Sequence, residues 1–146
     1  MLEQQYQLIY HRGKHDKTRG IPENSIPAFK RAIADGRGFE LDVHMSKDGE
    51  LVVIHDESVD RTTNGTGLVK DHTLAQLREL DAGIKKGEEF AGYKIPTFQE
   101  FMDWMKTLPE TMTIDIELKE YTHVDEQTAY EVADRVLKMV DEYGFT

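Results

Sequence analysis

The sequence predicts an α/β fold in which short strands alternate with amphipathic helices around a largely parallel sheet. Residues 39–44 and 112–119 alternate apolar and ionisable side chains with the period of two that is typical of strands. Residues 6–10 form another apolar run, and helical patterns lie between these strands. Sequential β/α units of this kind form parallel sheets with right-handed crossovers. We therefore expect the order β-α-β-insertion-α-β-α.

The first strand is expected at about residues 6–10, and a polar loop follows it. A helix begins near Asn24 or Ser25, either of which can cap it, and Pro27 fits its first turn because no N–H is needed there. Gly36 ends this helix. Its predicted buried stripe consists of Ile26, Phe29, Ala32 and Ile33.

The second strand is expected at residues 39–44, and a second apolar run follows at residues 51–54. The gap between them is too short for a helix, which favours a hairpin-like extension or a bend over a new β/α unit. Residues 57–71 have the composition of a loop, and Asn64-Gly65 is typical of a tight turn. The glycines near Arg61 match neither the dinucleotide nor the P-loop spacing, so a plain turn is the favoured interpretation.

The second half of the chain contains two further helical patterns and one strand. Thr73 begins a short helix, and residues 84–95 are expected to be an exposed insertion. Thr97 and Glu100 form a capping box whose helix runs to about residue 106. A strand at 112–119 and a helix at about 125–143 complete the chain. The predicted buried residues of the two longer helices are Phe98, Phe101, Met102, Met105, Ala129, Val132, Ala133, Val136, Leu137 and Val140.

Composition limits the classes of function. The chain has 146 residues, of which 38% are hydrophobic and 32% charged, and this suits one globular domain with a real core. Its formal net charge of −10 argues against nucleic acid or an anionic membrane as a partner. The absence of cysteine excludes disulfides and thiolate metal sites. The N-terminal residues match neither a signal peptide nor a membrane helix, so we expect a cytoplasmic protein without stable membrane insertion.

The length also bears on the architecture. A closed α/β barrel needs eight strands and typically about 250 residues, whereas this chain supplies about three β/α units. We therefore expect residues 1–146 to be a fragment of a larger fold. The last strand would then leave an unpaired sheet edge, which favours self-association.

Three carboxylates suggest a metal site. Glu40 and Asp42 lie two positions apart on one strand face, and Glu117 lies on the last predicted strand. Carboxylates that face one point repel each other unless protons or a cation intervene. Oxygen ligands without cysteine suit a hard divalent cation, Mg²⁺ or Ca²⁺. The alternative is a half-exposed strand with a solvated acidic face, since charged side chains lie mostly at the surface.

Two histidines and two cations accompany these acids. His11 and His55 each close an apolar run and titrate near neutral pH, which makes them candidates for the general acid and base. Arg12 suits bidentate contact with a phosphate or carboxylate, and Lys119 adds a point charge two residues after Glu117. The alternative is that both histidines are structural strand-end residues and that the two cations simply neutralise the acids.

Several short motifs occur in a single order between about residues 8 and 119. They are His11-Arg12-Gly13, Pro22-Glu23-Asn24-Ser25 with Ala28-Phe29, Glu40-Leu41-Asp42-Val43, Ser46-Lys47-Asp48-Gly49, Val52-Val53-Ile54-His55-Asp56, Arg61-Thr62-Thr63-Asn64-Gly65, Ile95-Pro96-Thr97 and Ile116-Glu117-Leu118-Lys119. With these motifs the chain resembles the glycerophosphodiester phosphodiesterase family.

The resemblance implies a TIM (β/α)8 barrel with a small insertion after the second strand, here at about residues 57–95. Residues 1–146 would form the N-terminal part of this barrel, with about three β/α units and without C-terminal barrel units. It implies metal-dependent hydrolysis of small-molecule glycerophosphodiesters to glycerol 3-phosphate and an alcohol. One histidine would activate the attacking oxygen, from water or the neighbouring glycerol hydroxyl, and the other would protonate the leaving alcohol. By resemblance, the metal ligands are Glu40, Asp42 and Glu117, the acid and base are His11 and His55, and Arg12 and Lys119 face the phosphate.

Two other interpretations stay open from the sequence. A related phospholipase of the sphingomyelinase D type would need an apolar loop that faces lipid, but residues 84–93 are too charged to suggest one. A barrel fragment that binds metal or phosphate without turnover is the second alternative. The sequence also leaves open the alcohol part of the substrate, the identity of the metal, and which histidine is the acid.

Overall fold

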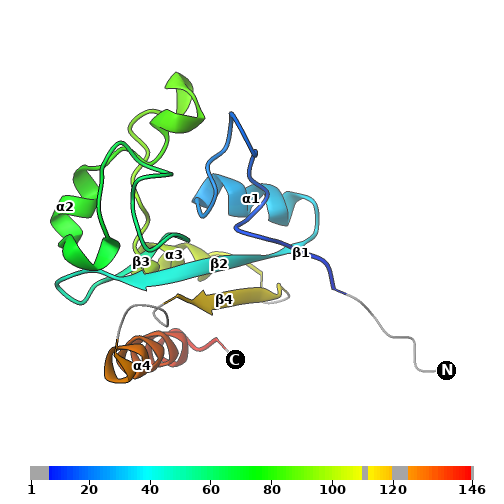
Figure 1. Ribbon diagram of the computed structural model, residues 1–146. Helices are drawn as coiled ribbons and strands as arrows, with labels where there is room; N and C mark the ends of the chain where they lie inside the picture. Colours follow the sequence, from blue (N-terminus) through cyan, green and yellow to red (C-terminus); the bar gives the residue numbers. More distant parts are fainter. Residues whose placement is uncertain (1–6, 110–111, 120–124, 146) are drawn as a thin grey trace.

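The computed structural model describes residues 7–109, 112–119 and 125–145, and its centre is a four-stranded sheet (Figure 1). Strand β2 (Gly38–Met45) pairs with each of the other three strands. Strands β1 (Ile9–Tyr10) and β4 (Ile114–Leu118) run parallel to it, and β3 (Leu51–Val53) is antiparallel. The predicted α/β fold with a parallel sheet is confirmed, as is the hairpin-like return after the second strand.

The helices begin at side-chain caps that the sequence indicated. They are α1 (Ile26–Ala34), α2 (Leu74–Glu79), α3 (Phe98–Met105) and α4 (Glu126–Glu142), with short 3₁₀ turns at Val69–Asp71, Ile84–Lys86 and Glu88–Phe90. Capping boxes at Thr73 and Thr97 start α2 and α3, and Asp125 caps α4. Ser25 caps α1 through the N–H of Ala28, at 3.3 Å. No helix within the described residues is long and apolar enough to cross a membrane.

The main core lies on one face of β2. Phe39 on this face stacks on Phe29 of α1 with ring centroids 4.4 Å apart, and Phe101 of α3 meets these two rings edge-on at 6.0 and 5.6 Å. Val132 and Val136 of α4 belong to the same buried cluster. Helices α1, α3 and α4 therefore pack on this face, and the period of two turns the ionisable residues of β2 to the opposite face.

The predicted helical stripes are largely buried, with one clear exception. Leu137 in α4 is 67% exposed, so its prediction as a core residue was wrong. It follows Val136 by one residue, which rotates it by about 100° around the helix axis, and α4 reaches the core through Val132 and Val136 instead.

The segment from 57 to 95 has a small core of its own. Figure 1 shows it, in green, beside the C-terminal end of β2. Its apolar contacts also involve the end of the β3 run, and the buried members of this cluster are Val52, Ile54, Val59, Val69, Leu77 and Ile95. The expectation that residues 84–95 are all exposed was wrong at Ile95, which is 2% exposed because it joins this second core.

The contrast between Phe101 and Leu137 gives a stability prediction. Phe101→Ala should lower the free energy of unfolding by about 3–5 kcal/mol, because it leaves a cavity between α1, α3 and β2. Leu137→Ala should change it by no more than about 0.5 kcal/mol. Urea denaturation followed by circular dichroism measures both values. Similar losses in the two variants would contradict this account of the core.

Candidate active site

Three carboxylates converge on the face of the sheet opposite the main core. The β2–β4 register places Asp42 beside Glu117, and Glu40 lies two residues earlier on the same strand face. One carboxylate oxygen from each of the three residues lies within 4.8 Å of the others. Glu40 is 5% exposed and Asp42 is fully buried. The alternative of a solvated acidic face is therefore wrong for β2, and these two charges need local compensation.

Part of that compensation comes from the loop after β1 and from the cap region of α1. The backbone N–H of Arg12 donates to Glu40 Oε2 at 2.8 Å. Asn24 Nδ2 donates to Asp42 Oδ2 at 2.8 Å, and Asn24 Oδ1 accepts from the Asp42 N–H at 3.2 Å. The side chain of Arg12 adds charge, with Nε 3.8 Å from Asp42 Oδ2. Both buried acids are thus held by groups that lie far from them in sequence.

The backbone at these two supporting residues is unusual. Arg12 has φ 57° and Asn24 has φ 52°, which places both in the left-handed region that non-glycine residues rarely adopt. The neighbouring Gly13 has φ 75°, and a Cβ there would lie 2.8 Å from the Cβ of Ala28. The N–H of Asn24 donates to the carbonyl oxygen of Arg12 at 3.0 Å, which joins the two strained positions. Such strain is typical of functional sites, where surrounding contacts maintain it.

Lys119 completes the polar cluster from the end of β4. Its ammonium hydrogen-bonds Glu117 and lies 3.2 Å from Asp42 Oδ1. Its backbone N–H donates to the carbonyl oxygen of Val43 at 3.0 Å, which fixes this end of β4 against β2. Ion pairing with Glu117 and Asp42 raises the pKa of Lys119 even though its partial burial opposes this. Lys119 therefore stays charged beside the acids at neutral pH.

Some acceptor capacity in the cluster remains unused. Among the described residues, Glu40 Oε1 is buried and receives no hydrogen bond, and buried Asp42 Oδ1 has the ion pair with Lys119 but no hydrogen bond of good geometry. Burial raises the pKa of Glu40 to about 7, Asp42 and Glu117 add to this effect, and the Arg12 N–H opposes it. The hydrogen bond from Lys119 lowers the pKa of Glu117. The cluster therefore has buried oxygens that a cation or a proton would stabilise.

The two candidate histidines lie near each other at this end of the sheet. Their ring centroids are 6.4 Å apart, and the planes are nearly perpendicular at 85°. His55 Nδ1 lies 2.7 Å from Asp56 Oδ1, while its carbonyl oxygen is 3.0 Å from His44 Nε2. A carboxylate on Nδ1 fixes the orientation of the ring.

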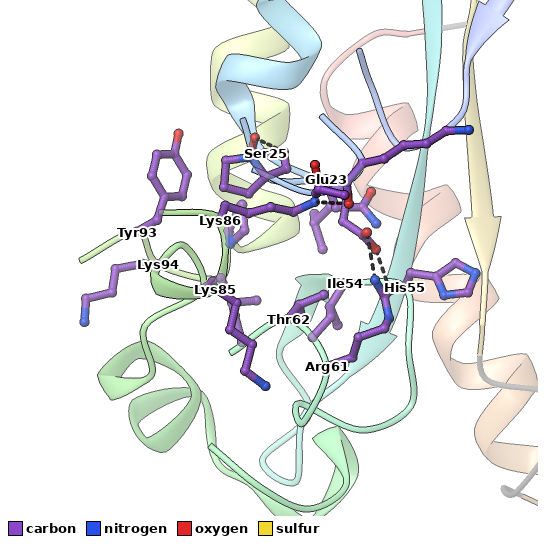
Figure 2. A pocket seen from close by; sticks show the side chains of 18 residues that line it. Glu23, Ser25, Ile54, His55, Arg61, Thr62, Lys85, Lys86, Tyr93 and Lys94 are labelled. Carbon is purple, nitrogen blue, oxygen red and sulfur yellow. Dashed lines mark hydrogen bonds and ion pairs between the residues drawn. The ribbon is translucent and has the colours of Figure 1, made fainter. Parts of the chain in front are cut away.

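A chain of ion pairs connects His55 with Arg12 through residues that sequence reasoning did not select as site residues. Arg61 donates to both oxygens of Asp56 at 2.7 and 2.9 Å, and to both oxygens of Glu23 at 2.6 and 2.9 Å. Glu23 also accepts from Arg12 Nη1 at 3.1 Å. Figure 2 shows Arg61 and Glu23 facing each other beside His55. The sequence indicated a plain turn at Arg61-Thr62-Thr63. In the structure this turn places the Arg61 guanidinium between two carboxylates of the site.

The two carboxylates that bind Arg61, those of Asp56 and Glu23, are ionised at neutral pH. Hydrogen bonding to Arg61 lowers the pKa of Asp56 to about 2, against the opposing effect of burial. Burial would raise the pKa of Glu23, but the ion pairs with Arg61 and Arg12 outweigh it and lower the value to about 2. The signal for Glu23 and Asn24 in the sequence was the Pro22-Glu23-Asn24-Ser25 motif, and for Asp56 it was the position directly after His55.

The position of the ionisable residues in the sheet is typical of one class of protein. Ionisable residues from β2 and β4, and from the segments that follow β1 and β3, meet at one end of a parallel α/β sheet, as in the enzymes of the α/β-barrel class. The model of the glycerophosphoryl diester phosphodiesterase family matches residues 11–145. The chain belongs to this family.

Several curated relatives carry the family activity in their names. A glycerophosphodiester phosphodiesterase of Caldanaerobacter subterraneus subsp. tengcongensis is 46% identical over 143 residues, which cover 94% of this chain and 54% of the relative. Human glycerophosphodiester phosphodiesterase 1 is 39% identical over 119 residues, covering 79% of this chain and 34% of the relative. The chain therefore spans about half the length of the first of these relatives and a third of the second.

Solved structures of the family share this fold. The glycerophosphodiester phosphodiesterase from Agrobacterium tumefaciens aligns with a TM-score of 0.78 at 32% identity, over 97% of this chain and 55% of that protein. A phosphodiesterase from Oleispira antarctica, solved in complex with the product sn-glycerol-3-phosphate, aligns with a TM-score of 0.77 at 32% identity, over 94% and 53%. The fold is thus that of a TIM-barrel-like α/β protein.

The raised pKa of Glu40 gives a testable pH dependence. Because the pKa is higher in the folded state than in the unfolded chain, stability falls as pH rises from about 4.5 through about 7. With divalent cations removed, Glu40→Gln should therefore be more stable than the parent protein at pH 8, by an amount on the order of 1–3 kcal/mol, and the gain should shrink below pH 5. Urea denaturation at several pH values measures it.

The matched control is Glu142→Gln, which removes the same charge from an exposed position at the end of α4. Its effect on stability should stay small and nearly constant with pH. If Glu40→Gln behaved in the same way, Glu40 would be ionised in the folded protein without penalty, and the account of crowded carboxylates would be wrong.

Proposed function

We propose that this chain carries the metal- and phosphate-binding residues of a glycerophosphodiester phosphodiesterase, which hydrolyses its substrate to glycerol 3-phosphate and an alcohol. The observation that supports this most directly is the convergence of Glu40, Asp42 and Glu117 beside the His11–His55 pair, in a chain that belongs to this family. The Oleispira relative, solved with sn-glycerol-3-phosphate as its product, supports the same reaction.

We propose Glu40, Asp42 and Glu117 as ligands of one divalent cation, Mg²⁺ or Ca²⁺. The donor set fits, because it consists of carboxylate oxygens, the ligands that these hard cations prefer. The buried oxygen Glu40 Oε1, which receives no hydrogen bond, supports this assignment. When bound, such a cation polarises a phosphate oxygen and compensates negative charge that develops on it.

Arg12 and Lys119 are proposed to bind the phosphate of the substrate. Both side chains are mostly buried, at 18% and 11% exposure, and both lie at the edge of the acid cluster. Glu23 holds Arg12 from one side, so its guanidinium is oriented before substrate arrives. Such preorganised cations contribute to catalysis by stabilising charge in the transition state.

His11 and His55 are proposed as the acid and base. One takes the proton from the attacking oxygen, which belongs to water or to the neighbouring glycerol hydroxyl, and the other gives a proton to the leaving alcohol. Asp56 orients the His55 ring through Nδ1, which leaves Nε2 for the substrate side. The arrangement allows either histidine to be the acid and the other to be the base.

We further propose that residues 1–146 form one partial barrel in which β1–α1, β2 with α3, and β4–α4 are successive units. The segment 57–95 would be the insertion after the second strand, which its separate small core supports. Among the described strands, β4 pairs only with β2, and a cavity of about 740 Å³ lies between α3, β4 and α4. Self-association of the chain stays a prediction that light scattering tests.

The proposed roles predict different kinetic defects. His11→Ala and His55→Ala should each lower kcat by about 10²–10⁴-fold at saturating Mg²⁺ or Ca²⁺, because proton transfer acts in the transition state. Glu40→Gln and Asp42→Asn should mainly raise the metal concentration needed for half-maximal activity. Release of glycerol 3-phosphate from glycerophosphodiesters measures all four.

Glu142→Gln serves as the unaffected control. Near-normal turnover of His55→Ala at saturating metal would make His55 structural and refute the two-histidine mechanism. No activity with any glycerophosphodiester, together with intact metal binding, would favour the alternative of a metal-binding chain without turnover.

Arg61 is predicted to act as a positioning residue through Asp56 and Glu23. Arg61→Ala should lower kcat by about tenfold and shift the pH–rate profile, because Arg61 orients Asp56 on His55 and holds the pKa of Asp56 at about 2. Arg61→Lys should recover only part of the rate, since lysine lacks the fork geometry that binds two carboxylates. An unchanged pH profile in Arg61→Ala would contradict this role.

A further inference from the structure

A second cavity lies beside the acid cluster, between the loop that precedes α1 and the insertion. Its volume is about 280 Å³, close to the lower limit for small-molecule sites. Its floor includes the buried apolar residues Val53, Ile54 and Ile95. His55 and Arg61 also line it, so this cavity adjoins the proposed reaction centre. The roles proposed for the acid cluster and the two histidines do not use this cavity.

The charge around this cavity is opposite to that of the whole chain. Lys17, Lys85, Lys86 and Lys94 line it, while the chain has a net charge of −10. The carboxylate among its lining residues is that of Glu23, which is already bound by Arg61 and Arg12. The residues that line the cavity therefore carry more positive than negative charge.

Lys86 is the most firmly placed of these cations. Its ammonium donates to the carbonyl oxygens of Asp16 at 2.5 Å and Lys17 at 3.1 Å, and its own carbonyl oxygen accepts from the Gly20 N–H at 2.9 Å. Figure 2 shows the side chain reaching from the insertion toward Glu23 and Ser25. A lysine ammonium has three N–H donors, so one remains for a bound anion.

Lys85 and Lys94 contribute further positive charge, and Asp81 offsets part of the charge of Lys94. The ammonium of Lys85 donates to the carbonyl oxygen of Asp60, and that of Lys94 lies 3.5 Å from the carbonyl oxygen of Glu79. Figure 2 shows both side chains directed away from the cavity, so they act on its potential rather than as direct contacts. Neutral carbonyl partners leave the positive charge of both groups in place.

We propose that this cavity binds the alcohol part of the substrate, and that it selects alcohols bearing an anionic group, such as a phosphorylated polyol, over cationic alcohols such as choline. The inference rests on the proposed phosphodiesterase function and adds a substrate class to it. A diester whose phosphate lies at Arg12 and Lys119 places its leaving alcohol beside His55, which borders the cavity. Lys86 then donates to the anionic group.

The test compares substrates that differ by one charged group. Glycerophosphoinositol 4-phosphate should be hydrolysed with a higher kcat/KM than glycerophosphoinositol, and glycerophosphocholine should be the poorest of the three. Lys86→Gln should reduce kcat/KM for the phosphorylated substrate about tenfold and for glycerophosphoinositol no more than about twofold. Lys86→Arg keeps the charge and should recover most of the preference.

A second variant avoids any dependence on the structural contacts of Lys86. Lys85→Gln combined with Lys94→Gln should lower the preference about threefold, and the effect should fade as salt rises from 50 to 500 mM. Lys30→Gln combined with Lys138→Gln removes the same net charge from exposed positions on α1 and α4 and should leave the preference unchanged.

Measurements of substrate binding distinguish a failure of the proposed cavity from a failure of the proposed hydrolysis. Calorimetry in the presence of a metal chelator measures the binding of the two inositol substrates without turnover. The phosphorylated substrate should bind the parent protein more tightly than glycerophosphoinositol does, and Lys86→Gln should bind the two substrates equally. Absence of hydrolysis with this binding difference intact would refute the function alone. Hydrolysis with equal binding, or a preference insensitive to the lysines, would overturn the subsite. Inorganic phosphate that binds through Lys86 without competing with substrate would also overturn it.

Discussion

Two buried carboxylates on the central strand are the constraint on which the rest of the site depends. Glu40 and Asp42 have nearly no exposure, and burying ionised groups costs far more free energy than the packing around them can return unless partners are provided. The turn after β1, the cap region of α1 and the end of β4 all supply such partners. The strained backbone at Arg12 and Asn24 is a consequence of this requirement.

The insertion is connected to the same site by charge rather than by apolar packing alone. Arg61 lies in the turn of the insertion, and it binds Asp56 next to His55 and Glu23 next to Arg12. One guanidinium thus orients groups on both sides of the proposed phosphate position. Arginine suits this task because its fork of donors stays charged and can bind two carboxylates at once.

The distribution of charge in the site is compatible with the proposed anionic substrate in an otherwise acidic protein. Most of its negative charge lies away from the acid cluster, while Arg12, Lys119 and the lysines around the second cavity lie beside it. Electrostatic interactions are screened within about 8–10 Å at ordinary salt, so the local distribution of charge matters more than the net charge. An anion that approaches this end of the sheet therefore meets cationic side chains around the proposed metal site.

The sequence by itself determined the elements and the chemistry of the site residues. Local rules decided these: the period of two identified Glu40 and Asp42 as a pair on one strand face, and the capping box at Thr97 indicated where a helix starts. Local periodicity did not predict the exposure of Leu137. Val136 and Leu137 are adjacent apolar residues on the same helix, and only the tertiary packing decides that Val136 is the buried one.

Tertiary structure alone decided which partners meet. The β2–β4 register brings Glu117 to Asp42, and the folded insertion brings Arg61 to Glu23 across 38 positions of sequence. It also decided that the acids are buried and that four dispersed lysines surround one cavity. These outcomes depend on contacts between segments distant along the chain, and the residue pattern of each segment carries no information about what will lie opposite it.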